Sequence, residues 1–224
     1  MAKKVFIGVG HGGKDPGAVA NGFKEADLNL QIALACQKEL IRHGVTVGIS
    51  RTKDENDELT EEIKECNAFG PDLCVDIHNN AGGGDGVEAF CEVKGGVSKT
   101  LADNILNEIV KIGQNSRGRK TKVNSSGKDW FGFIRQTNAP AVLVECAFVD
   151  NKNDIKIIDT LAEQQKMGVA IAKGILKTLG ITYKALTQTT GKIYKVQVGA
   201  YSVKANAEAM QKKLKTAGFD AIIV

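Results

Sequence analysis

Histidine and glutamate side chains able to bind a metal ion stand next to apolar runs in separate parts of the sequence. His11 lies between glycines directly after the apolar run at 4–9. His78 follows a second apolar run, 73–77, and a glycine-rich stretch comes after it as well. Two imidazoles and one carboxylate form the ligand set typical of catalytic zinc, in which a fourth position is left for water. The pattern therefore favours a zinc site if suitable carboxylates accompany the two histidines.

Two glutamates meet this requirement. Glu25 opens the helix predicted after the His11 loop, so the chain returns it to the same edge of the sheet. Glu145 ends an otherwise apolar run, where a carboxylate is costly to bury unless a metal ion or a hydrogen-bond donor meets it. We therefore predict that His11, Glu25 and His78 bind one Zn²⁺ ion, and that Glu145 takes a proton from a water molecule at that ion.

Three aspartates are alternatives to Glu25 as the third ligand. Asp15 lies in a D-P-G turn, and Asp27 lies further into the predicted helix. Asp76 precedes His78 by two residues, and we expect it to point to a side face rather than along the end of the strand. Glu25 is therefore the favoured ligand.

The elements that would position these side chains alternate between two periodicities. Strand-like runs occur at 4–9, 45–50, 73–77, 87–93 and 141–146, helix-like runs occur at 25–42, 59–69, 97–112 and 163–179, and an extended stretch is expected near 130–135. Such alternation predicts an α/β domain with a mostly parallel sheet and helices on both of its faces. In such sheets ligands bind outside the carboxyl ends of the strands, which is where both histidines fall.

Composition limits the remaining possibilities. A chain of 224 residues, 42% of them hydrophobic, is ample for one α/β domain with a small additional segment. We see neither an export signal nor the roughly 20 consecutive apolar residues of a membrane span, so we expect a protein made in the cytoplasm without membrane insertion. The five cysteines form no C-x-x-C pair, and we expect reduced thiols.

Two further features have structural interpretations. His43 precedes Gly44 at the end of the first predicted helix, where it would interact with the helix dipole rather than bind a ligand. The segment 115–130 carries five basic residues, but without interleaved aromatic side chains we predict a solvated loop and no nucleic-acid binding.

The sequence changes character near residue 181. Residues 182–192 are polar and rich in threonine, so we predict a linker there, which leaves 1–181 as the main domain. Residues 193–224 have the pattern of a strand, a helix ending at Gly218 and a short strand. A βαβ unit of this size buries too little apolar surface to be stable alone.

Four segments taken together resemble a known family. They are "GVGHGGKDPGA", "FKEADLNL", "CVDIHNNAGGGDGVE" and "APAVLVECAFVDN". In order and spacing they resemble the motifs of the zinc-dependent N-acetylmuramoyl-L-alanine amidases of the amidase-3 type, and the resemblance extends over about residues 3–180.

The resemblance implies a six-stranded α/β fold and the cleavage of one amide in bacterial peptidoglycan, the bond between the lactyl group of N-acetylmuramic acid and L-alanine. It also implies that His11, Glu25 and His78 bind zinc and that Glu145 is the catalytic glutamate. Where relatives have a glycine after the catalytic glutamate, this chain has "ECAF", a departure that removes no ligand.

Two residues outside the metal site could contact the substrate. Arg135 resembles an arginine of the family that lies just before the catalytic strand, where it could bind a carboxylate of the muropeptide. Trp130 could form an aromatic wall for the peptide or the sugar. A surface arginine and a core aromatic are the alternative interpretations.

The C-terminal segment resembles one half-repeat of the SPOR-type wall-binding modules. Because those modules contain two such units, we expect either a homodimer that shares one module or a chain cut short. Without an export signal, the enzyme would reach the wall through a phage holin or through lysis of a sporulating mother cell.

Three other functions compete with the amidase. They are a zinc exopeptidase on a similar sheet, a wall-binding protein without catalysis, and a thiol hydrolase that uses Cys146 with His78.

Overall fold

The computed structural model describes residues 2–186, 196–216, 219 and 221–223. The chain divides into two compact units, Met1–Lys184 and Ala185–Val224. Most of the predicted linker and the first residues of the predicted half-repeat lie outside the described residues.

A six-stranded sheet forms the centre of the first unit, with the strand order β4-β1-β5-β8-β6-β7. The strands are β1 (Lys4–Val9), β4 (Thr46–Ile49), β5 (Leu73–Asn80), β6 (Val87–Cys91), β7 (Ser116–Lys120) and β8 (Ala141–Phe148). Neighbouring strands are parallel except β6 and β8, which are antiparallel. The predicted mostly parallel sheet is therefore confirmed, and a separate pair, β2 (Val19–Ala20) and β3 (Phe23–Lys24), precedes the first helix.

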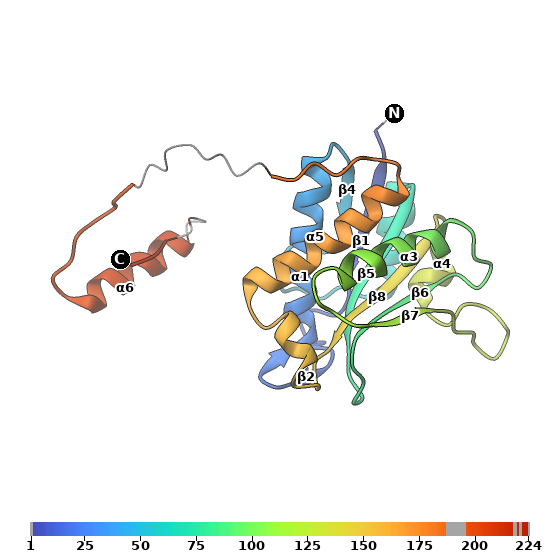
Figure 1. Ribbon diagram of the computed structural model, residues 1–224, viewed down its shortest axis with the longest axis horizontal. Coiled ribbons are helices and arrows are strands. Elements are labelled where there is room, and N and C mark those ends of the chain that lie inside the picture. Colours follow the sequence, from blue (N-terminus) through green and yellow to red (C-terminus); the bar gives the residue numbers. More distant parts are fainter. Residues whose placement is uncertain (1, 187–195, 217–218, 220, 224) are drawn as a thin grey trace. The chain divides into compact units, whose positions relative to one another are not determined.

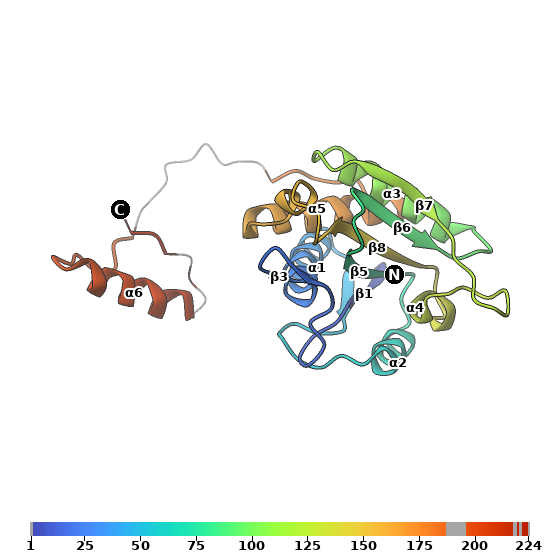
Figure 2. The same ribbon diagram turned by 90° about the horizontal axis from the view of Figure 1, so that it is seen from below.

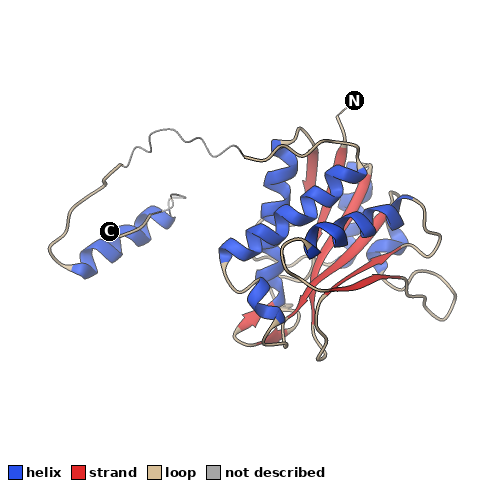
Figure 3. Cartoon of the chain, in the orientation of Figure 1, coloured by secondary structure: helices blue, strands red, loops and turns tan. Residues whose placement is uncertain are grey.

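Helices cover both faces of this sheet unequally (Figures 1 and 2). One face carries α1 (Glu25–Arg42), α3 (Val97–Val110) and α5 (Leu161–Thr178), which pack on the larger apolar core. The other face carries α2 (Leu59–Phe69) and the short α4 (Gly132–Gln136) over a smaller cluster. A 3₁₀ turn, η1 (Asp154–Ile157), follows β8, and Figure 3 shows the strands enclosed between these layers.

Strand alternation decides which side chains reach the less covered face. On β5, Val75 and Ile77 belong to the larger core, so Asp76 and His78 point to the side of α2 and α4. On β8, Val144 belongs to the same core, so Glu145 points with His78. The polar ends of both strands therefore lie on the face that the two shorter helices only partly cover.

Two sequence predictions are wrong. The stretch near 130–135, expected to be extended, contains the helix α4, which buries Phe133 and Ile134. So short an apolar run has no readable period. The basic segment 115–130, expected to be a loop, contains the edge strand β7. A strand at the edge of a sheet tolerates charged side chains, so its composition concealed it.

His43 has the predicted structural role. It ends α1, at the opposite end from Glu25, and its Nδ1 lies 2.9 Å from the carbonyl oxygen of Glu39. Its ring stacks on Tyr183 with centroids 5.0 Å apart, and its Nε2 accepts a hydrogen bond from the Lys184 amide at 2.9 Å. These contacts fasten the last residues of the first unit to the end of α1.

Two further observations concern the cysteines and the helices. All five cysteines are buried and free of disulfide bonds. In the described part of the chain, no helix combines the length and the apolar composition that crossing a membrane requires.

The second unit contains α6 (Lys204–Thr216), the predicted helix. No strand occurs at 196–203, at 219 or at 221–223, the described residues on either side of it. The predicted end of the helix at Gly218 lies outside the described residues.

Candidate metal centre and catalytic glutamate

His11 lies one residue beyond Gly10 at the carboxyl end of β1, in a backbone conformation that is unusual for its type. Its φ is 64°, in the left-handed region, which costs a residue other than glycine about 1–2 kcal/mol. Its Nδ1 lies 2.7 Å from the Asp15 carboxylate, a contact that fixes the ring. The other ring nitrogen, Nε2, is left facing the helix α1.

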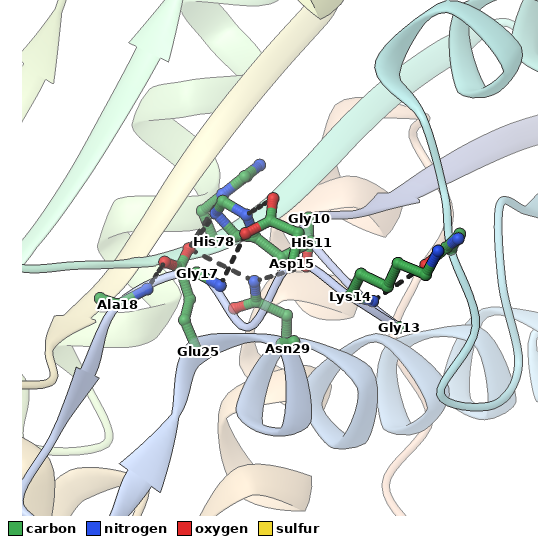
Figure 4. A network of polar contacts seen from close by, with 12 residues as sticks. Gly10, His11, Gly13, Lys14, Asp15, Gly17, Ala18, Glu25, Asn29 and His78 are labelled. Carbon is green, nitrogen blue, oxygen red and sulfur yellow. Dashed lines mark hydrogen bonds and ion pairs between the residues drawn. The ribbon is translucent and has the colours of Figure 1, made fainter.

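Glu25 joins the two histidines (Figure 4). It is the first residue of α1, and its Oε1 lies 3.2 Å from Nε2 of His11 and 3.0 Å from Nδ1 of His78. The backbone amides of Asn79 and Ala18 donate hydrogen bonds to its two oxygens, at 3.1 and 2.9 Å. The carboxylate is thus held between the histidines by the main chain on both sides.

The ring of His78 rests directly on Gly10. A Cβ atom at Gly10 would lie 2.2–2.5 Å from three ring atoms, so only glycine leaves room for the imidazole. The remaining nitrogen, Nε2, lies 3.3 Å from Oδ2 of Asp76. Each histidine therefore has an aspartate at the nitrogen that faces away from Glu25, the arrangement that orients metal-binding histidines.

The structure shows where the three aspartates considered as alternative ligands lie. Asp15 and Asp76 contact the far sides of the histidines, and Asp27 is exposed on α1. As expected, Asp76 points to a face of the sheet, the one that α2 covers, and it is not part of the cluster of three ligand atoms. Because residues two apart on a strand share a face, it lies beside His78.

The electrostatics of this cluster keep the carboxylate ionised. Burial alone would raise the pKa of Glu25, but its hydrogen bonds with His11 and His78 outweigh burial and lower that pKa. The same contact with Glu25 raises the pKa of His11. Burial lowers the pKa of His78, but the carboxylates of Asp76 and Glu25 outweigh burial and raise that pKa above its ordinary value. An ionised Glu25 is the form that binds a cation.

The donor set fits a zinc ion. One ligand atom from each of His11, Glu25 and His78 can be chosen so that all three lie within 4.8 Å of one another. Ligand atoms about 2.1 Å from a tetrahedral zinc ion lie roughly 3.4 Å apart. The two measured separations, 3.2 and 3.0 Å, are close to that value. Within the described residues this is the one such group of histidine, cysteine and acidic side chains.

Glu145 lies beside the cluster on the next strand. It is the register partner of His78, so the two side chains project from neighbouring strands on one face. Its Oε2 is buried, and among the described residues it has no hydrogen-bond partner. Burial raises the pKa of Glu145 to about 7, despite the opposing effect of His78. A buried carboxylate without a donor calls for a ligand or a proton.

The next residue excludes one alternative. Cys146 points into the larger core, away from Glu145 and His78. Burial raises the pKa of its thiol far above the ordinary value. A thiol hydrolase built on Cys146 and His78 is therefore inconsistent with the structure.

The two predicted substrate contacts, Arg135 and Trp130, interact with residues near them in the sequence. Arg135 donates hydrogen bonds to the carbonyl oxygens of Asp129 and Trp130, both at 2.7 Å. The Trp130 ring is half exposed, with Nζ of Lys122 4.3 Å from its centroid. In the described part of the chain no hydrogen bond joins either residue to the metal cluster.

Sequence reasoning missed one organising residue, Arg51. It is buried, and its guanidinium donates to the carbonyl oxygens of Val9 at 3.1 Å and Ala26 at 2.8 Å. It thus ties the end of β1, which precedes His11, to the start of α1, which carries Glu25. No local sequence pattern predicts this role, because the link forms only when β4, which ends just before Arg51, pairs beside β1.

A parallel sheet with a His₂Glu cluster at its carboxyl edge and a free buried glutamate beside it is typical of an α/β metallohydrolase. Comparison with known proteins makes the class specific. Residues 5–177 match the family model for N-acetylmuramoyl-L-alanine amidase, and residues 171–224 match the SPOR domain model.

Individual relatives agree. The chain is 36% identical over 225 residues to the N-acetylmuramoyl-L-alanine amidase CwlM of Bacillus licheniformis, covering 99% of this chain and 84% of that one. It is 35% identical over the same length, with the same coverage, to a sporulation-specific N-acetylmuramoyl-L-alanine amidase of Bacillus subtilis (strain 168). The crystal structure of an N-acetylmuramoyl-L-alanine amidase from Clostridium difficile 630 superposes with a TM-score of 0.73 at 31% identity, covering 80% of this chain and 97% of that one.

This protein belongs to the N-acetylmuramoyl-L-alanine amidase family, with a SPOR domain at its C-terminal end. It is a hydrolase of peptidoglycan, and neither the exopeptidase nor the wall-binding protein without catalysis is supported.

Proposed function

We propose that this amidase is a zinc enzyme in which His11, Glu25 and His78 hold the ion and Glu145 is the catalytic residue. Its substrate is the amide between the lactyl group of N-acetylmuramic acid and L-alanine of the stem peptide. The observation that carries the proposal is the convergence of three ligand atoms within 4.8 Å beside a buried carboxylate without a partner.

Each chain residue has a defined task in this proposal. A zinc ion supplies Lewis acidity, which polarises a carbonyl group and makes water acidic enough to attack near neutral pH. Glu145 accepts the proton of the attacking water at Oε2, which has no competing donor among the described residues. The protonated Glu145 then donates to the alanine nitrogen as the amide bond breaks. Asp15 and Asp76 hold the two imidazoles in position.

Several finer assignments belong to the same proposal. Arg135 and Trp130 would contact the muropeptide from the surface next to α4. Residues 193–224, after a linker at 182–192, would bind peptidoglycan as a SPOR half-repeat, and two chains could share one complete module. Release through a holin or through mother-cell lysis would bring the enzyme to the wall.

The decisive experiment digests purified peptidoglycan and identifies the products by mass spectrometry together with an assay for new L-alanine amino termini. We expect these termini to appear, to disappear with EDTA and to return when Zn²⁺ is added. Products with any other new end would contradict the assigned bond.

One variant separates catalysis from metal binding. Glu145→Gln keeps the size of the side chain but cannot accept a proton, so turnover should fall about 10²–10⁴-fold while zinc affinity stays unchanged. A Glu145→Gln enzyme with the wild-type rate would remove Glu145 from the chemistry.

A further inference from the structure

A row of charged side chains continues from the metal centre across the sheet. His78 on β5 is in register with Glu145 on β8, and Glu145 is in register with Glu88 on β6. Residues in register on neighbouring strands point to the same face. Glu88 therefore lies one strand beyond the proposed catalytic residue on the same side of the sheet.

The next strand, β7, supplies two cations to this row because its pairing is irregular. Val87 pairs with Ser116 and Ala89 with Arg119, so β7 has one residue more than β6 between the two pairs. Gly118 takes a φ of 83° at this bulge, a conformation that glycine adopts without strain. As a result Arg117 and Lys120 both contact Oε1 of Glu88.

Arg119, between them, faces the other way. Its Nε donates to Asp103 on α3 at 2.8 Å, on the face covered by the three long helices. One strand thus presents Arg117 and Lys120 on the side of Glu145 and Arg119 on the opposite side.

The cluster of Glu88, Arg117 and Lys120 carries a net positive charge that solvent can reach. Glu88 is 4% exposed, whereas the side chains of Arg117 and Lys120 are 40% and 34% exposed. Burial raises the pKa of Glu88, but the two cations outweigh burial and keep it ionised. One buried anion therefore anchors two cations, leaving one positive charge in excess.

Arg117 is also held in a fixed orientation. Its guanidinium carbon lies 5.2 Å from the centroid of the Phe148 ring, and its Nε contacts Glu88. Among the described residues its terminal nitrogens make no hydrogen bond. A fixed guanidinium with free terminal donors is suited to a carboxylate, which accepts two parallel hydrogen bonds.

We propose that Arg117 and Lys120 bind a carboxylate of the stem peptide, on the residue that follows the L-alanine whose amino group the reaction frees. This inference rests on the proposed role of Glu145. Two strand spacings, roughly 10 Å, separate the backbone of Glu145 from that of β7. An extended peptide covers about 3.5 Å per residue, so one residue beyond alanine comes within reach of an arginine side chain.

The test uses two muramoyl peptides that differ at one group. In one, the residue after L-alanine carries a free carboxylate, and in the other a carboxamide. We expect the wild-type enzyme to prefer the carboxylate about 10-fold or more in kcat/KM, mainly through KM. Arg117→Gln/Lys120→Gln should lose most of that preference, and Arg119→Gln, on the opposite face, should retain it.

A second variant guards against misfolding. Removing both cations leaves the Glu88 carboxylate buried without a cation beside it. Glu88→Gln/Arg117→Gln/Lys120→Gln therefore removes the whole cluster without an isolated buried charge. This triple variant should hydrolyse both peptides equally, at the rate with which the wild-type enzyme hydrolyses the carboxamide peptide. Equal hydrolysis of both peptides by the wild type, or a preference that survives in the triple variant, would overturn the inference. Hydrolysis of the carboxamide that depends on Glu145 would still support the proposed function.

Discussion

Replacing Gly10 by alanine tests whether the position of the His78 ring controls metal binding. The added Cβ would lie 2.2 Å from the nearest ring atom, whereas ordinary contact begins at 3.4 Å. The backbone of Gly10 cannot easily retreat, because it donates to Ile77 at 3.1 Å and accepts from Asn29 at 2.9 Å. The imidazole must therefore move by about 1.2 Å, the difference between those two contact distances.

A displacement of this size exceeds what a metal site tolerates. Ligand distances in working sites hold to about 0.2 Å, and disturbing the groups around a ligand costs about 10–100-fold in metal affinity. We therefore expect Gly10→Ala to weaken zinc binding about 10–100-fold, or roughly 1.4–2.7 kcal/mol. Competition with a chromophoric zinc chelator measures this directly.

The matched control is Gly174→Ala on α5. There the added Cβ would lie 2.5 Å from the Cα of Ile105 on α3, which forces apart two helices that carry none of the proposed metal ligands. This variant should lose about 1–3 kcal/mol of stability, despite the higher helix propensity of alanine, and should bind zinc normally. A folded Gly10→Ala protein with wild-type zinc affinity would refute the proposed geometry.

Three further predictions concern charged groups in the first unit. Asp15→Ala removes the partner of His11 and should lower zinc affinity about 10-fold, measured with the same chelator. Burial and, after it, the neighbouring Asp76 raise the pKa of Glu62. Above the ordinary carboxyl pKa the unfolded state therefore releases a proton that the folded state keeps, which destabilises the fold. Glu62→Gln should therefore stabilise the protein at pH 7, and the gain should vanish in urea unfolding below pH 4; a gain independent of pH would contradict this. Asp154→Ala leaves the buried amides of Gly86 and Phe148 without an acceptor and removes one of the two acceptors of Gln114, so it should cost about 3 kcal/mol or more of unfolding free energy. A loss within about 0.5 kcal/mol would show that water replaces the carboxylate.

The metal cluster could be predicted from the sequence because its members lie at the ends of clear apolar segments. A histidine directly after a buried strand reaches the carboxyl edge of a parallel sheet wherever that strand is placed. His11 satisfies this condition, whereas His78, expected just after its strand, lies within β5 two residues before its carboxyl end. Glu25 opens a helix whose apolar spacing is clear from the sequence. Their positions follow from the apolar periodicity of each segment and from the rule that the carboxyl ends of parallel strands meet at one edge of the sheet.

Other parts depend on register, which the sequence does not encode locally. The cluster of Glu88, Arg117 and Lys120 forms only because β7 has an extra residue opposite β6. The segment was predicted to be a solvated loop because its side chains are charged, yet pairing uses the backbone alone. Strand alternation correctly placed Asp76 on a face of the sheet, but its contact with Nε2 of His78 was not predicted, although residues two apart on a strand share a face.

The stacking of Tyr183 on His43 determines where the polypeptide leaves the first unit. Helix α1 has 18 residues, and at about 1.5 Å per residue it separates its two ends by roughly 27 Å. Glu25 stands at one end, and the chain departs from the other. A tag, a surface tether or a fusion partner joined after Lys184 would therefore start at the end of α1 far from Glu25, which makes this junction a suitable place to immobilise the enzyme.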